Sequence, residues 1–150
     1  MKKIYHKIKK HPQVKKIINN KKFQKHEKWF LVVFWAAGIF YLSSSPLDEF
    51  FWGFDAWEFI IRKLAHMFVF GVLFFLIFRY LSYTEKRNLH WNLLWAFIFS
   101  VLYGISDEYH QTLVPGRHGT ATDVLIDTIG ILIASWLVYY EYYHQKNKKL

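Results

Sequence analysis

Ionisable side chains are concentrated between residues 106 and 130, in the segment SDEYHQTLVPGRHGTATDVLIDTIG. Its polar members include carboxylates, histidines, an amide and an arginine, namely Asp107, Glu108, His110, Gln111, Arg117, His118, Asp123 and Asp127. A shorter basic set precedes it in RKLAH, with Arg62, Lys63 and His66. A histidine close to a carboxylate can act as general acid or base, and an arginine can hold a phosphate or a carboxylate through two hydrogen bonds. These residue types indicate acid–base chemistry or an anion site.

The spacing within these sets is helical. Residues three or four positions apart share a helix face. The pairs with this spacing are Arg62 and His66, Lys63 and His66, Asp107 and Gln111, and Asp123 and Asp127. Tyr103 lies one turn before Asp107 on the same side. Each set therefore points its polar groups in one direction, and the helices that carry them decide whether the sets meet.

Four apolar runs supply those helices: Trp29–Leu42, Leu64–Phe78, Trp91–Ile105 and Val124–Tyr140. Each is shorter than the roughly 20 residues that cross a bilayer, which would also fit a soluble bundle of buried helices. However, the runs are apolar on all faces, neutral serines extend two of them, and tryptophan and tyrosine mark several ends. With 53% hydrophobic and 21% aromatic residues, the sequence predicts an all-α bundle of four transmembrane helices. It contains no cysteine, which excludes disulfides and thiolate metal sites.

The distribution of basic residues predicts the orientation of the bundle. The first 28 residues carry 11 lysines, the C-terminal tail carries three more, and the 79–90 connection is basic, whereas the segment between the first two helices is acidic. The positive-inside rule places both termini and the 79–90 connection in the cytoplasm. The polar sets of the second, third and fourth helices then lie together at their outer ends. We therefore expect a multi-pass protein of the cell membrane with an outward-facing polar cavity.

The flanking segments predict surface elements. Apolar residues at helical spacing among the lysines of residues 1–28 indicate an interfacial helix on anionic lipid, although a solvated tail fits equally. A nucleic-acid-binding arm is disfavoured, because the arm has no arginine and no recognition motif. The aromatic residues Phe50, Phe51, Trp52, Phe54 and Trp57 predict a short helix on the outer interface, or the start of a longer second helix. We divide the chain into a lysine-rich arm (1–28), a membrane domain (29–142) and a basic tail (143–150).

The connection LVPGRHGTATD is expected to be an ordered loop. Pro115 and Gly116 suit the central positions of a type II turn, and Thr120 with Asp123 resembles the capping pattern that opens a helix. Arg117 would then lie at the mouth of the cavity. Beyond the loop, Gly130 and Ala134 form a small-xxx-small pattern that allows close helix approach.

The segments RKLAH and SDEYHQTLVPGRHGTATDVLIDTIG resemble the VanZ-like family of small bacterial membrane proteins, named for a member linked to teicoplanin resistance. The resemblance covers about residues 29–140. The polar signature of the family falls on Arg62, Lys63, His66, Asp107, Glu108, Gln111, Arg117, Asp123 and Asp127. In the family a Glu-Tyr pair often follows the histidine, and Val69 and Phe70 stand there in this chain. The resemblance implies action at the cell envelope and leaves the activity open.

Three functional interpretations remain open. The polar residues could be a structural network, or they could bind an anionic lipid, a peptidoglycan precursor or a glycopeptide-like ligand and so confer resistance. In that case the ligand-binding residues are Arg62, Lys63, Tyr103, Gln111, Arg117, Asp123 and Asp127. Alternatively, the protein is a hydrolase or transferase in which His66, Asp107 and Glu108 are catalytic, an interpretation to which a weak similarity to type 2 phosphatidic acid phosphatases adds little.

No cofactor and no metal are predicted. Asp107, Glu108, His110 and Asp123 carry hard ligand atoms, but no HExxH motif supports zinc. A transporter is not favoured, because the chain has only four predicted spans and no detectable inverted repeat. The oligomeric state stays open.

Overall fold

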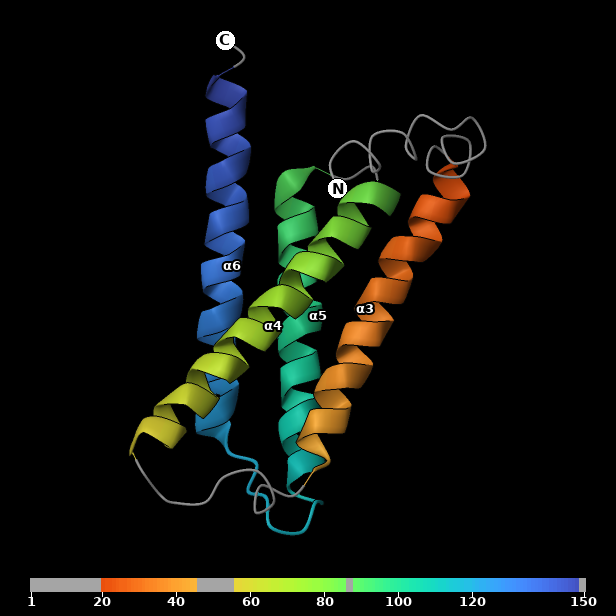
Figure 1. Ribbon diagram of the computed structural model, residues 1–150. Coiled ribbons are helices and arrows are strands. Elements are labelled where there is room, and N and C mark those ends of the chain that lie inside the picture. Colours follow the sequence, from red (N-terminus) through yellow and green to blue (C-terminus); the bar gives the residue numbers. More distant parts are fainter. Residues whose placement is uncertain (1–19, 46–55, 86–87, 149–150) are drawn as a thin grey trace, which may run out of the picture.

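The computed structural model describes residues 20–45, 56–85 and 88–148, and every regular element in them is an α-helix. The helices are α3 (Lys21–Ser43), α4 (Ala56–Thr84), α5 (Leu89–Gln111) and α6 (Ala121–Asn147). They run alternately in opposite directions, so α3 and α5 end where α4 and α6 begin (Figure 1). We call this end of the molecule the polar end and the opposite end the basic end. The predicted all-α fold class is confirmed for these residues.

Polar side chains set the first residue of three helices. Asn20 caps α3 by accepting from the backbone N–H of Lys22 at 2.9 Å, and Asn88 caps α5 by accepting from that of Trp91 at 3.1 Å. Thr120 caps α6 in the same way through the N–H of Asp123 at 3.2 Å. Such caps satisfy amide groups that have no partner within the helix. Each helix therefore extends beyond its apolar run.

Three helices are long and apolar enough to cross a membrane: Ile60–Thr84 within α4, Leu89–Gln111 and Ala121–Asn147. Large apolar side chains such as Phe68, Leu102 and Trp136 are exposed on their outer faces. These faces have no other helix of the described chain to cover them, which fits contact with lipid. Three of the four predicted spans are thus supported by length and composition, and the first stays a prediction.

α4 lies diagonally across the bundle and contacts all three other helices, whereas α3 contacts α4 and α5 but not α6 within the described residues (Figure 1). The apolar core lies at these crossings, with Phe70, Leu73 and Phe74 of α4 fully buried. At the α4–α6 crossing, a Cβ added to Gly130 would overlap the backbone of Met67. The close approach predicted from Gly130 is confirmed.

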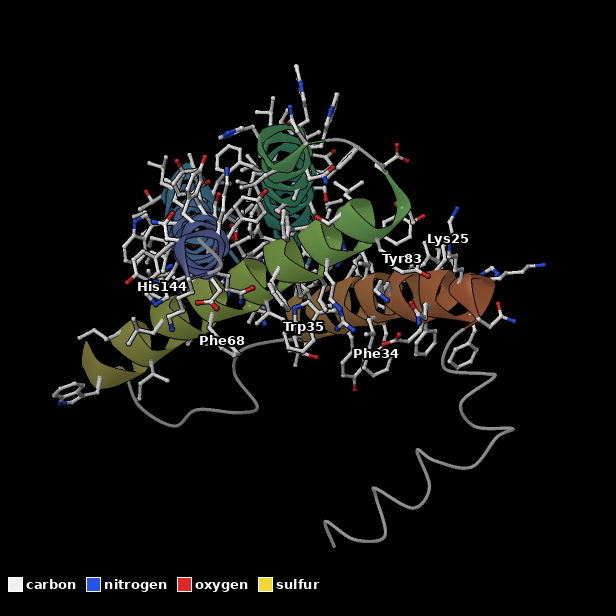
Figure 2. The ribbon with its side chains drawn as sticks, turned by 90° about the horizontal axis from the view of Figure 1, so that it is seen from above. Lys25, Phe34, Trp35, Phe68, Tyr83 and His144 are labelled. Atoms are coloured by element: carbon white, nitrogen blue, oxygen red, sulfur yellow. The ribbon has the colours of Figure 1, made fainter. Side chains whose placement is uncertain are left out.

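Two polar contacts fasten α3 to the rest of the bundle. Trp35 faces α4 and donates its indole N–H to the Val69 carbonyl at 3.0 Å, whereas Phe34 points away from the bundle (Figure 2). The Tyr103 hydroxyl of α5 donates to the Ala36 carbonyl at 2.6 Å. Both bonds satisfy polar groups within an apolar layer, so breaking either one would be costly. They therefore fix where α3 lies along α4 and α5.

The flanking predictions meet the structure only in part. Trp57 belongs to α4, so for this residue the longer second helix is correct and the separate interfacial helix is wrong. The other residues of that predicted helix, and the predicted interfacial helix of the arm, lie outside the described residues. α3 runs without a break across the predicted boundary at residue 28, and α6 runs across the one at residue 142.

Candidate functional site

The loop between α5 and α6 has the predicted turn. Gly116 has a φ of 78°, and the backbone N–H of Arg117 donates to the Val114 carbonyl at 3.1 Å. A positive φ at the third residue and this closing hydrogen bond define a type II turn with Pro115 and Gly116 at its centre. Gly119 packs directly on α5, since an added Cβ would overlap the Glu108 carbonyl. The loop is therefore held tightly against the end of α5.

Arg117 holds this loop against the end of α3. Its Nε donates to the Ser45 carbonyl at 2.9 Å and its Nη2 to the Leu42 carbonyl at 2.8 Å. These carbonyls lie at the C-terminal end of α3, where the helix dipole is negative, and the Leu42 carbonyl also accepts from the backbone N–H of Ser45 at 3.4 Å. Burial lowers the pKa of the Arg117 guanidinium, and the nearby carboxylates of Asp107 and Glu108 raise it. Arg117 thus has a structural role, and its remaining N–H groups are those available to a ligand.

Two ion pairs join α4 to α6 at the polar end. Lys63 Nζ pairs with Asp123 Oδ1, and one turn further His66 Nδ1 lies 3.3 Å from Asp127 Oδ1. The helical spacing read from the sequence produces this double contact, because both pairs of residues repeat every three or four positions. Lys63 and Asp123, both predicted to bind ligand, are therefore occupied with each other.

The carboxylates of α5 are bound by neighbouring donors. Asp107 Oδ2 accepts from Ser43 Oγ at 2.8 Å and from Gln111 Nε2 at 2.9 Å. Glu108 Oε1 accepts from the same Gln111 nitrogen at 3.1 Å, and Glu108 Oε2 accepts from the backbone N–H of Thr120 at 2.9 Å. Gln111 thus bridges two adjacent carboxylates. Both carboxylates are almost fully buried, at 3% and 4% exposure, so these donors replace water at Asp107 Oδ2 and at both Glu108 oxygens, whereas Asp107 Oδ1 has no hydrogen-bond donor among the described residues.

The centre of the site is formed by one residue from each of three helices. Ligand-type atoms of His66, Glu108 and Asp127 all lie within 4.8 Å of one another. Phe70 forms the apolar floor, with its ring 6.3 Å from both the His66 and the Tyr103 rings. The expected convergence of the second, third and fourth helices is therefore present. We call His66, Glu108 and Asp127 the central trio.

Some predicted residues lie outside this centre. Tyr103 uses its hydroxyl to bind α3, as described above. Arg62 is half-buried and makes no hydrogen bond or ion pair with the described residues. His110 stacks on Phe40 at 4.3 Å and lies 2.9 Å from Ser44 Oγ through Nε2, so it contacts α3.

Sequence reasoning missed the serines at the end of α3 and the amide of Thr120 as partners of the site. Ser43 and Ser44 were noted only because they lengthen an apolar run. An antiparallel topology places the end of the first helix at the same depth as Asp107, and this was the available signal. The alternative metal set of Asp107, Glu108, His110 and Asp123 does not form, because Asp123 pairs with Lys63 and His110 faces α3.

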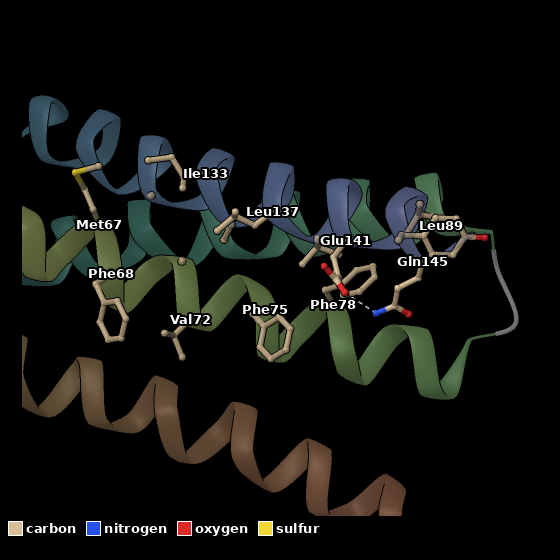
Figure 3. A pocket seen from close by; sticks show the side chains of 15 residues that line it. Met67, Phe68, Val72, Phe75, Phe78, Leu89, Ile133, Leu137, Glu141 and Gln145 are labelled. Carbon is tan, nitrogen blue, oxygen red and sulfur yellow. Dashed lines mark hydrogen bonds between the residues drawn. The ribbon is translucent and has the colours of Figure 1, made fainter. Parts of the chain in front are cut away.

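An open apolar groove of about 710 Å³ runs along the α4–α6 contact (Figure 3). It begins at Met67 and Gly130. Met67 directly follows His66 in the sequence, and Gly130 lies one helical turn after Asp127. It ends at Glu141 and Gln145, whose side chains form a hydrogen bond of 2.6 Å. Between its ends the lining is apolar, with Val72, Phe75, Ile133 and Leu137 among its residues. The groove therefore links the polar end to the basic end.

Long apolar helices with a buried polar cluster at one end are typical of an α-helical membrane protein. A model of the VanZ/LLP1 family matches residues 8–141, and the protein belongs to this family. The match begins well before Trp29, so it includes much of the lysine-rich arm that the resemblance left out. No curated protein and no solved structure matches the chain.

Proposed function

We propose that the protein binds an envelope lipid that carries a phosphate, with the headgroup at the polar end and the hydrocarbon chain in the α4–α6 groove. One observation carries this proposal: the groove starts at Met67 and Gly130, which are close in sequence to His66 and Asp127, and continues between α4 and α6 as a mostly apolar surface as far as Glu141 and Gln145. A water-soluble ligand would need the polar cluster alone. An amphiphile would use both, and burial of each methylene contributes about 0.8 kcal/mol relative to water.

The orientation proposed for this site faces outward. Lys21, Lys25, Arg79 and Lys146 lie at the basic end, where α3 starts and α4 and α6 end. The positive-inside rule places this end in the cytoplasm. The polar cluster is then at the outer side of the cell membrane, where lipid-linked cell-wall precursors and the outer leaflet are accessible.

α3 is proposed as the fourth span. Its 23 residues extend about 35 Å at 1.5 Å per residue, enough for a hydrocarbon core of about 30 Å. Its outer face carries exposed Phe30, Val33 and Phe34, which would be costly in water. Its basic first turns lower its mean hydropathy, and they suit a position at the cytoplasmic headgroups.

Two sources of ligand share the same chemistry: a phosphoglycerolipid and a lipid-linked cell-wall precursor. Arg62, one turn before His66, is the cation proposed to meet the phosphate. Binding of the precursor would alter glycopeptide susceptibility, which is the route by which we propose that the protein confers teicoplanin resistance.

Native mass spectrometry of the detergent-purified protein tests this proposal. Phosphatidylglycerol, undecaprenyl phosphate and teicoplanin are the three probes, and phosphatidylcholine is the neutral-headgroup reference. Ile133 lines the groove at 48% exposure and its neighbour Leu132 does not, at 53%. We expect Ile133→Trp to weaken binding of the preferred lipid about tenfold, equivalent to loss of a few buried methylenes, and Leu132→Trp to leave it unchanged.

Arg62→Gln should remove the preference for the phosphate lipid over phosphatidylcholine. Equal binding by both tryptophan variants and by wild type would refute the groove, and binding of teicoplanin alone would refute the lipid ligand.

A second candidate function is a membrane-embedded hydrolase or transferase acting on such a lipid. It is favoured by the position of His66, 3.3 Å from Asp127 and close to Glu108, which suits transfer of a proton. Release of inorganic phosphate from undecaprenyl diphosphate, measured for wild type and His66→Gln, tests it. Absence of release by wild type would refute a phosphatase activity.

A further inference from the structure

The central trio brings together three side chains that bind metals in other proteins. His66 comes from α4, Glu108 from α5 and Asp127 from α6, and each offers one atom to a cluster in which no two lie more than 4.8 Å apart. We propose that the central trio binds a divalent metal ion, Zn²⁺ or Mn²⁺. No motif in the sequence predicts this set, because its members are 42 and 19 residues apart along the chain.

An independent observation points to a ligand at this position. Asp127 is 1% exposed, and neither of its carboxylate oxygens has a hydrogen-bond donor among the described residues; the same holds for His66 Nδ1. His66 Nδ1 and Asp127 Oδ1 lie 3.3 Å apart, but the orientation of the two groups does not allow a hydrogen bond between them. Buried carboxylate oxygens without a hydrogen-bond donor are costly, so native proteins normally provide them with one. A metal ion would take the place of that donor.

The distances fit a metal ion of this size. Ligand atoms with bonds of about 2.1 Å lie about 3.4 Å apart in a tetrahedral site and at most about 4.2 Å apart around any common centre. The 3.3 Å between His66 and Asp127 matches the first value. The 4.8 Å limit for the trio requires at most a small inward movement of a side chain, and rotation of the Glu108 carboxylate can provide it.

The charges of the site also favour a cation. Asp107, Glu108 and Asp127 are all buried, while Lys63 pairs with Asp123 and Arg117 donates to carbonyls of α3. His66 lies beside Asp127, and one imidazolium would balance one of the three carboxylates. A buried cluster with excess negative charge is unstable unless cations or protons neutralise it. A divalent ion would balance two of the three carboxylates.

Neighbouring groups already orient the ligands. The N–H of Thr120 and the amide of Gln111 hold the Glu108 carboxylate, and such outer contacts are typical of metal sites. The trio supplies three ligands, so at least one coordination position stays open. A phosphate oxygen could occupy it, and the ion would then attract a headgroup that three carboxylates alone would repel. Only this last step depends on the proposed lipid.

Metal binding by the full-length protein in detergent tests the inference without lipid. The protein is stripped with EDTA and titrated with ZnCl2 or MnCl2, while calorimetry and elemental analysis measure affinity and stoichiometry. We expect the wild-type protein to bind one equivalent of metal ion tightly. His66→Gln and Asp127→Asn should weaken it by at least about 100-fold, since loss of an outer-shell contact alone costs 10- to 100-fold.

Matched controls exclude adventitious binding. His110→Gln and Asp123→Asn make the same chemical changes outside the trio and should retain the tight equivalent. Histidines elsewhere, including those of the arm, would bind metal equally in every variant. The inference is overturned if wild type binds no tight equivalent, or if His66→Gln and Asp127→Asn bind as wild type does. His66→Gln, at a half-buried position, keeps the test decisive if Asp127→Asn fails to fold.

Discussion

Replacement of Gly130 by alanine should separate α4 from α6. An added Cβ would lie 2.7 Å from Met67 Cα, whereas carbon atoms in contact are normally about 3.5–4.0 Å apart, so the helices must move apart by about 1 Å. Overpacking of this kind costs up to about 3 kcal/mol, and the higher helix propensity of alanine offsets about 0.5–1 kcal/mol of it. A net loss of about 2 kcal/mol lowers the Tm by about 4–8 °C for a chain of this size.

Thermal melting in detergent, followed by far-UV circular dichroism, measures this effect. Gly38→Ala is the matched control, because an added Cβ there meets no atom within 4 Å, and it should leave the Tm unchanged or raise it slightly. Gly130 lies one turn beyond Asp127 and contacts Met67, next to His66, so the same separation should also weaken Zn²⁺ binding by the central trio. If Gly130→Ala and Gly38→Ala have the same Tm, the close contact between Gly130 and Met67 does not contribute to the stability of the α4–α6 crossing.

Three further predictions test the orientation, the loop and the site. In a chain without native cysteine, His118→Cys should react with an impermeant thiol reagent in intact cells and Glu85→Cys should not; the reverse pattern would invert the membrane orientation. Arg117→Lys should lower the Tm by about 3–6 °C, because one ammonium group cannot span both carbonyls and about 1.5 kcal/mol is lost; an unchanged Tm would mean that these bonds do not fasten the loop. Asp127→Asn should raise the Tm of the metal-free protein at pH 8 by about 2–4 °C, roughly 1 kcal/mol, and abolish the further rise on adding Zn²⁺; a lower metal-free Tm would show that Asp127 stabilises the fold as the partner of His66.

The four helices of the described residues could be predicted from the sequence, but their ends could not. The four apolar runs mark the helices because apolar stretches of this length are rare outside them. Their ends depend on single polar residues such as Asn20 and Asn88, which lie outside any apolar pattern. Trp57 shows the same limit, because an aromatic residue suits both an interfacial helix and the first turn of a membrane span.

The position of the site could also be predicted, since antiparallel helices place their polar ends together. The turn at Pro115 and Gly116 and the cap at Thr120 followed from local chemistry and are confirmed. The choice of partners did not follow. Arg117 has carboxylates and helix carbonyls within reach, and whether it binds one or the other depends on packing of α3, which spacing along α5 and α6 does not encode.

The partners of the carboxylates separate the structural part of the cluster from the functional part. Asp123 has Lys63, and Glu108 has Gln111 and the Thr120 amide, so these contacts are accounted for by a network that holds four helices together. Asp127 has no hydrogen-bond donor among the described residues, although it is the most deeply buried of the carboxylates. His66 Nδ1 lies 3.3 Å from Asp127 Oδ1 without hydrogen-bond geometry, and an apolar residue of similar volume would be more stable there than such a buried charged contact. The structural network therefore explains Asp123 and Glu108, whereas Asp127 and His66 are the residues for which we propose a metal ion as the further partner.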